Sequence, residues 1–154
     1  MSMLVNLLKF VTLFMTAISA GGTAYISIVE VPAREEMDTE AAVKSWRSIF
    51  PLAMTYFKSQ GIVMMALAPL NFLLTKNRFW LPPTAFLVAL SPYTIKFMGP
   101  VNDQLLDQSL DIESDEARQL ITLWGERHLI RTYFTVAAFF FAMLACLSPS
   151  EQEN

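Results

Sequence analysis

Four long runs of uncharged residues constrain the fold of this chain more than any other feature. They cover residues 10–29, 59–75, 79–95 and 132–150, with lengths of 20, 17, 17 and 19 residues. About 20 residues at a rise of ~1.5 Å each cross the ~30 Å hydrocarbon core of a bilayer. We therefore predict an all-α fold, an integral membrane four-helix bundle. It forms a single domain over residues 1–154, with spans at about 5–31, 52–75, 79–98 and 129–148.

The composition supports a chain embedded in lipid. Hydrophobic side chains make up 54% of the residues and charged ones 16%, whereas roughly a quarter of a soluble domain is charged. Apolar residues lie all around the four segments, as is typical of helices surrounded by lipid. Two alternatives stay open: buried helices of a soluble protein and, for the first segment, a secretory signal cleaved after Ala20.

The residue inventory excludes several function classes. A net charge of −3 provides no basic surface for nucleic acid. Cys146 is the only cysteine and His128 the only histidine, so an intrachain disulfide and a Cys/His zinc site are excluded. We expect no metal site and no bound cofactor. The expected partners are the lipid bilayer and a small apolar or aromatic ligand, and homo-oligomerisation is left open.

Charged residues gather on one side of the predicted bundle. Twenty of the 25 lie on the side of the 1–2 and 3–4 connections, and only five lie on the other: Lys9, Lys76, Arg78, Glu151 and Glu153. Polar chemistry is therefore expected on the crowded side. The positive-inside rule nominally places that side in the cytoplasm, but the margin disappears when candidate site residues are discounted. The sequence predicts a multi-pass membrane protein without indicating its compartment.

Short amphipathic helices are expected in both connections on the crowded side. In the 1–2 connection, Thr39 can cap a helix that places Trp46 on the membrane surface, and Pro51 then opens the second span.

In the 3–4 connection, Pro100 is expected to end the third helix, and residues 102–111 form a polar stretch. A new helix starting at Ser114 or Asp115 then leads into the fourth span.

Each predicted span has ionisable residues near its crowded-side end, where charges usually face the bundle interior, a wet cavity or an opposite charge. Glu30 and Arg34 are one helical turn apart, which allows an ion pair if Pro32 preserves the helix. Lys96, near the end of the third span, can equally reach lipid headgroups without a functional role.

The fourth span carries the most informative spacing. Trp124, His128 and Arg131 stand at i, i+4 and i+7, so they lie on one helix face. Together they offer a stacking surface, a titratable imidazole and a fixed cation to a planar, acidic aromatic molecule. On spacing alone, the competing interpretation is an interfacial aromatic beside a membrane-edge histidine and arginine.

Three motifs on the crowded side resemble those of the anthrone oxygenase-like membrane family. The third span ends in Pro-x-Asn-x-x-Leu at residues 100–105, and the fourth opens with Trp-x-x-x-His-x-x-Arg at residues 124–131. The first helix ends in Val-x-x-Pro-Ala-Arg at residues 29–34. The order and spacing of the motifs match over nearly the whole chain. The resemblance implies a four-span enzyme, because fungal members oxidise polyketide anthrones to anthraquinones with molecular oxygen and without a recognised metal or flavin motif.

The hypothesis built on this resemblance assigns catalysis to His128, Arg131 and Asn102. His128 would take a proton from an acidic carbon, Arg131 would hold the oxygen of the resulting anion, and Asn102 would donate a hydrogen bond to it. Molecular oxygen would be the co-substrate. The expected substrate-binding residues, all on the crowded side, are Trp124, Glu30, Arg34 and Lys96.

An alternative from a different class is a non-catalytic membrane protein that binds a lipid-like ligand or scaffolds a partner. The same residues would then fasten the loops to the bundle. A claudin-like protein is less favoured because a lone cysteine cannot form the expected disulfide. A transporter is less favoured because four spans would have to oligomerise to build a path.

Overall fold

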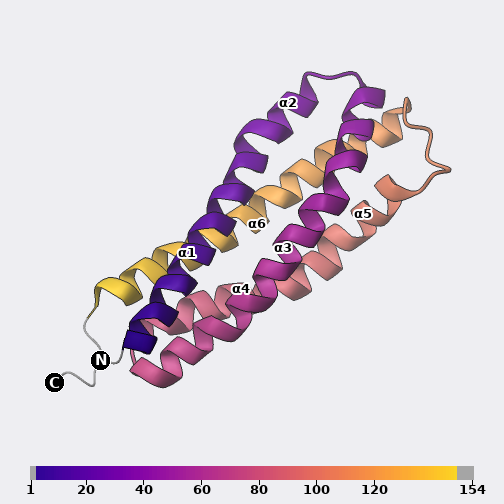
Figure 1. The fold of residues 1–154 in the computed structure, drawn as a ribbon. Helices are drawn as coiled ribbons and strands as arrows, with labels where there is room; N and C mark the ends of the chain where they lie inside the picture. Colours follow the sequence, from indigo (N-terminus) through magenta and orange to yellow (C-terminus); the bar gives the residue numbers. More distant parts are fainter. Residues whose placement is uncertain (1–2, 149–154) are drawn as a thin grey trace.

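Four long helical segments run side by side in the computed structural model, which describes residues 3–148 (Figure 1). The first comprises α1 (Met3–Tyr25), a π-helical turn η1 (Ile26–Glu30) and α2 (Val31–Glu35). The second is α3 (Thr39–Thr75). The third comprises η2 (Arg78–Trp80), α4 (Leu81–Tyr93), a second π-helical turn η3 (Thr94–Met98) and α5 (Gly99–Leu106). The fourth is α6 (Asp115–Leu147), and no strand occurs within residues 3–148, so the predicted all-α bundle is confirmed.

Three stretches within residues 3–148 are long and apolar enough to span a membrane. They are Met3–Glu35, Thr39–Thr75 and Asp115–Leu147. The third segment is less regular, since α4 itself has only 13 residues and η3 separates it from α5. The three long helices identify the chain as a membrane protein.

The two ends of the bundle differ in their connections (Figure 1). At one end, here the loop end, residues 36–38 join α2 to α3 and residues 107–114 join α5 to α6. At the opposite end, here the turn end, residues 76–77 join α3 to η2 in a tight turn, and α1 begins and α6 ends nearby. This arrangement agrees with the division of charge seen in the sequence.

The expected surface helix of the first connection is the beginning of α3. The helix continues through Pro51 without a break, and Trp46 is buried among the helices at 1% exposure instead of lying on the membrane surface. A proline inside a helix removes one hydrogen bond, and burial of the Trp46 face offsets that loss. Asp38 is the N-cap in place of Thr39, because its carboxylate accepts from the Ala41 amide at 2.7 Å.

Helix α5 overturns the expectation that Pro100 ends the third helix. The π turn η3 directly precedes it, so the helix continues from α4 into α5, and the wider π turn accommodates Pro100 in the first turn of α5. Asn102 is therefore helical, and the loop covers residues 107–114 only. Helix α6 begins at Asp115 as predicted, with Ser114 accepting from the Ala117 amide at 3.2 Å.

Two arginines fasten the loops to the helices at the loop end. Arg118 on α6 donates to the Met37 carbonyl at 2.6 Å. Arg47 on α3 donates to the carbonyls of Leu105 at 2.7 Å and Asp107 at 2.6 Å. These bonds satisfy carbonyls at helix ends and hold α2, α3, α5 and α6 in fixed positions around the space described next.

Candidate functional site

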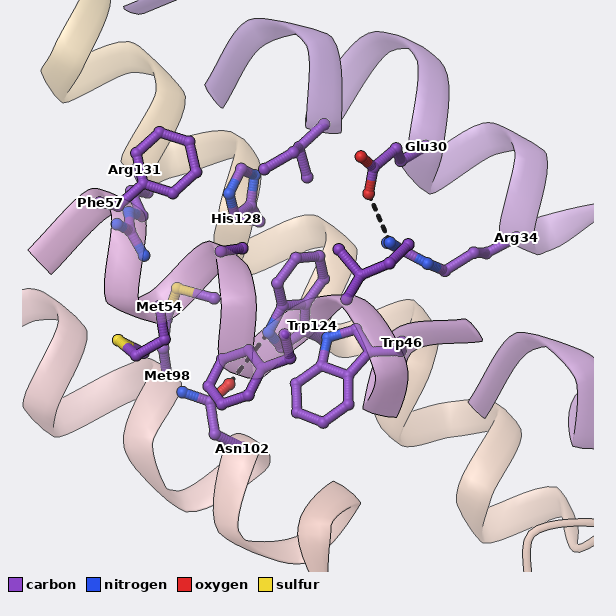
Figure 2. Close-up of a pocket in the computed structure, with 14 residues that line it drawn as sticks. Glu30, Arg34, Trp46, Met54, Phe57, Met98, Asn102, Trp124, His128 and Arg131 are labelled. Atoms are coloured by element: carbon purple, nitrogen blue, oxygen red, sulfur yellow. Dashed lines mark hydrogen bonds and ion pairs between the residues drawn. The ribbon is translucent and has the colours of Figure 1, made fainter. Parts of the chain in front are cut away.

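A pocket opens among the four helical segments near the loop end (Figure 2). The space between its lining side chains is about 440 Å³ when the open mouth is included. Apolar side chains of α3 form one wall, among them Trp46, Phe50, Met54 and Phe57. The polar side chains that line it come from the other three segments: Glu30, Arg34, Asn102, His128 and Arg131.

His128 is held at the pocket by contacts on several sides. Its side chain is 2% exposed, and its ring stacks on Trp124 with centroids 4.8 Å apart and planes inclined by 22°. Its Nδ1 atom lies 3.0 Å from the Ser27 hydroxyl. No hydrogen-bond partner is recorded for its Nε2 atom within the described part of the chain.

Trp124 links His128 to Asn102. Its indole N–H donates to Asn102 Oδ1 at 3.0 Å, and its ring meets Trp46 edge-on at 5.9 Å. Because Oδ1 is the acceptor, the Asn102 amide group remains the donor for a ligand. Trp124 is 7% exposed and lines the pocket, where it also supports these two pocket residues.

The predicted ion pair of the first helix is present. Arg34 Nη2 lies 2.5 Å from Glu30 Oε2, and Arg34 is 3% exposed with its guanidinium 5.7 Å from the Trp124 ring centroid. Pro32 does not break the pair, because the helix continues past it from the π turn η1 into α2.

Arg131, unlike Arg34, has no ion-pair partner within residues 3–148. Its buried Nε atom has no hydrogen-bond partner there, and its guanidinium lies 5.4 Å from the Phe57 ring centroid. Arg34 likewise leaves Nε and Nη1 without partners in this range. One pair plus one unpaired cation give the pocket a net positive charge, which suits a ligand with one acidic group.

Lys96 lies outside the pocket. Its side chain is exposed and its ammonium group lies 5.4 Å from the Phe97 ring centroid on the same helical segment. The other six residues predicted for the site all line the pocket: Glu30, Arg34, Asn102, Trp124, His128 and Arg131.

Sequence reasoning missed Ser27 and the role of Trp46. Both π turns adjoin the pocket: η1 contains Ser27 and Glu30, and η3 ends at Met98 in the pocket wall. Such turns widen a helix by one residue per turn and are frequent at functional sites. The sequence signal that could have suggested Ser27 is its position one turn before Glu30, as a polar residue in an apolar run.

Comparison with known proteins gives one result. The family model described as anthrone oxygenase matches residues 46–141. This range contains Asn102, Trp124, His128 and Arg131, whereas the pocket residues of the first helix lie before it. Neither the curated proteins nor the solved structures include a match. Because the matched range exceeds half of the chain and carries most of the pocket, this protein belongs to the anthrone oxygenase family.

Proposed function

We propose that the protein is an oxygenase that converts an apolar aromatic substrate with an acidic CH₂ group, of the anthrone type, into its ketone with molecular oxygen. The observation that carries this proposal is the convergence of His128, Arg131 and Asn102 on one pocket. A base, an anion-binding cation and a neutral donor are the three groups that stabilisation of a carbanion with charge on oxygen requires.

The reaction begins with proton transfer. His128 Nε2 takes one proton from the CH₂ carbon, and the electron pair of the broken C–H bond is delocalised onto the ring oxygen as an enolate or phenolate. Arg131 holds that oxygen, and the Asn102 amide donates a hydrogen bond to it. Apolar walls such as Phe57 and Met54 keep water away from the anion.

Oxygen then reacts with the anion. A C–O bond forms between the carbon and O₂, which is reduced to a peroxide anion, and the proton returns from His128 to give a hydroperoxide. Loss of the second C–H proton breaks the O–O bond, forms the C=O bond and releases hydroxide, which leaves as water with that proton. One oxygen atom enters the product and the other becomes water, so no resident metal or flavin is required.

The membrane provides the route to the site. We propose that the third segment, from Leu81 to Leu106, is the fourth span, since at ~1.5 Å per residue it exceeds the ~30 Å hydrocarbon core. An apolar substrate then reaches the pocket from the lipid, and the loop end lies at one membrane surface.

The test is oxygen-dependent formation of a quinone from a simple anthrone, followed optically with detergent-purified protein and corrected for the rate without protein. We expect turnover that is lost in His128→Ala and kept in Tyr133→Ala, whose side chain on the same helix is 63% exposed. Absence of turnover in stable wild-type protein would overturn the proposal. If the anthrone then still quenches tryptophan fluorescence, the non-catalytic ligand-binding alternative would replace it.

A further inference from the structure

A row of hydrogen-bonded hydroxyl groups begins at His128, and neither of the residues that carry them, Ser27 and Thr132, lines the pocket. The Nδ1 atom lies 3.0 Å from Ser27 Oγ, and Ser27 Oγ lies 2.8 Å from Thr132 Oγ1. Thr132 Oγ1 donates to the Thr23 carbonyl at 3.0 Å, with the His128 carbonyl of its own helix as a longer alternative acceptor at 3.3 Å. Three successive contacts thus connect the imidazole to a backbone carbonyl, and all lie between the first helix and α6.

The number of hydrogens in this row decides the tautomer of His128. Each of the three contacts needs one hydrogen, and the two hydroxyl groups of Ser27 and Thr132 supply only two. The carbonyl of Thr23 supplies none. All three contacts are satisfied only when the third hydrogen is on Nδ1, so that the imidazole donates to Ser27, Ser27 to Thr132, and Thr132 to Thr23.

We infer that Ser27 and Thr132 are positioning residues that hold His128 in the Nδ1–H tautomer, with the lone pair of Nε2 available to the pocket. The catalytic consequence rests on the proposed function, in which Nε2 is the base. A histidine base needs its second nitrogen fixed in this way, because the wrong tautomer has no free lone pair where the substrate proton lies.

The row of hydrogen bonds ends at the Thr23 carbonyl, and this has a second consequence. A peptide carbonyl accepts a hydrogen bond but does not take up a proton at neutral pH, so the row orients the imidazole without conducting protons to solvent. The proton that Nε2 takes from the substrate therefore has to return through the pocket. This fits a reaction in which the same proton is given back to the peroxide.

The π turn η1 places Ser27 within reach. Within it the amide of Val31 bonds to the carbonyl of Ile26, five residues back, which widens the helix at this point. The Trp124 ring stacked on His128 fixes the plane of the imidazole at the same time. Stacking sets the ring plane, and the row of hydroxyl groups sets which nitrogen carries the proton.

The tautomer of His128 can be measured directly, because the protein has a single histidine. Protein labelled with ¹⁵N-histidine in detergent is expected to give an amine-type signal from Nδ1 and an imine-type signal from Nε2. In Ser27→Ala we expect a mixture of tautomers. Ser27→Thr should restore the wild-type spectrum. Thr135→Val, which removes a hydroxyl one turn further along α6, should leave it unchanged.

A wild-type spectrum with the proton on Nε2, or on both nitrogens, would overturn the inference, and so would an unchanged spectrum in Ser27→Ala. This readout does not depend on turnover, so failure of the inference and failure of the proposed function are distinguishable. Where the anthrone is turned over, Ser27→Ala should lower kcat on the order of 10–100-fold with KM within about twofold. Thr135→Val should change neither constant.

Discussion

The loop end and the turn end of the bundle bury polar groups of different kinds. At the turn end they are neutral: Asn71 donates to Thr12 Oγ1 at 2.7 Å, and Asn77 donates to the Ala145 carbonyl at 3.0 Å. At the loop end the buried groups include the charged Arg34 and, at the pocket, Arg131 with a buried Nε that lacks a partner within residues 3–148.

The neutral groups of the turn end join helices to one another, whereas the arginines at the pocket leave polar atoms without partners within residues 3–148. A buried neutral amide atom without a partner costs about 1–3 kcal/mol, and Asn71 Oδ1 has no partner within residues 3–148. A cation in an apolar setting costs more, unless an opposite charge, a hydrogen-bond partner or water compensates it. Loss of stability without loss of function is therefore expected from changes at the turn end, and the reverse from changes at the pocket.

Replacement of Arg131 should give the largest effect. In Arg131→Gln we expect turnover of the anthrone to fall on the order of 10²–10³-fold, as for removal of an oxyanion donor. Thermal unfolding in detergent should stay at the wild-type Tm or rise, because an uncompensated charge is removed. Arg127→Gln is the matched control, since Arg127 binds the Phe97 carbonyl outside the pocket.

Arg127→Gln should turn over the anthrone within about twofold of the wild-type rate, and its Tm should be somewhat lower than that of the wild type. Equal turnover in the two variants would show that Arg131 is a membrane-edge cation without a role at the pocket, and would remove the main contrast between the two ends.

The second effect concerns how closely α6 approaches the first helix beside the pocket. A Cβ atom added at Gly125 would lie 2.7 Å from Val31 Cγ1, which is closer than packed carbons allow. We expect Gly125→Ala to destabilise the protein by about 1–3 kcal/mol, measured as a lower Tm. The double variant Gly125→Ala, Val31→Ala should recover most of this loss, because the valine methyl groups are removed.

Gly61→Ala serves as the comparison for that variant, since nothing lies within 4 Å of the Cβ atom it would add. The Tm of Gly61→Ala should equal or exceed that of the wild type, because alanine has the higher helix propensity. A similar fall in both alanine variants would point to a general intolerance of the helices and not to the contact with Val31.

The helical bundle could be predicted because its signal is distributed over many residues. Long uncharged runs indicate membrane helices regardless of individual side chains, and the division of charge indicated which connections share an end. The positions at which helices begin and end were harder to predict. Pro51 and Pro100 were expected to begin or end helices, but burial of Trp46 and the π turn before Gly99 compensate for the prolines, and both depend on tertiary packing.

The candidate site was predictable where one helix carries it. The spacing of Trp124, His128 and Arg131 follows from helix geometry alone, and all three line the pocket. The position of Ser27 one turn before Glu30 could have suggested a polar site, but its contact with His128 was not predictable, because the two residues are 101 positions apart and a π turn lies at Ser27. Lys96, which the sequence also placed at the site, is exposed and does not line the pocket.

The smallest effect is expected at the turn end, from the contact between Asn71 and Thr12. Side-chain hydrogen bonds between membrane helices contribute about 0.6 kcal/mol on average, so Asn71→Leu should lower the Tm slightly and leave turnover of the folded protein unchanged. A double-mutant cycle with Thr12→Val isolates the pair, because Asn71 also donates to the Leu67 carbonyl at 2.9 Å. A coupling energy near zero would mean that packing alone holds the turn end. A loss of turnover in Asn71→Leu would contradict the division of roles between the two ends, since this residue lies far along α3 from the pocket wall at Trp46 and Phe57.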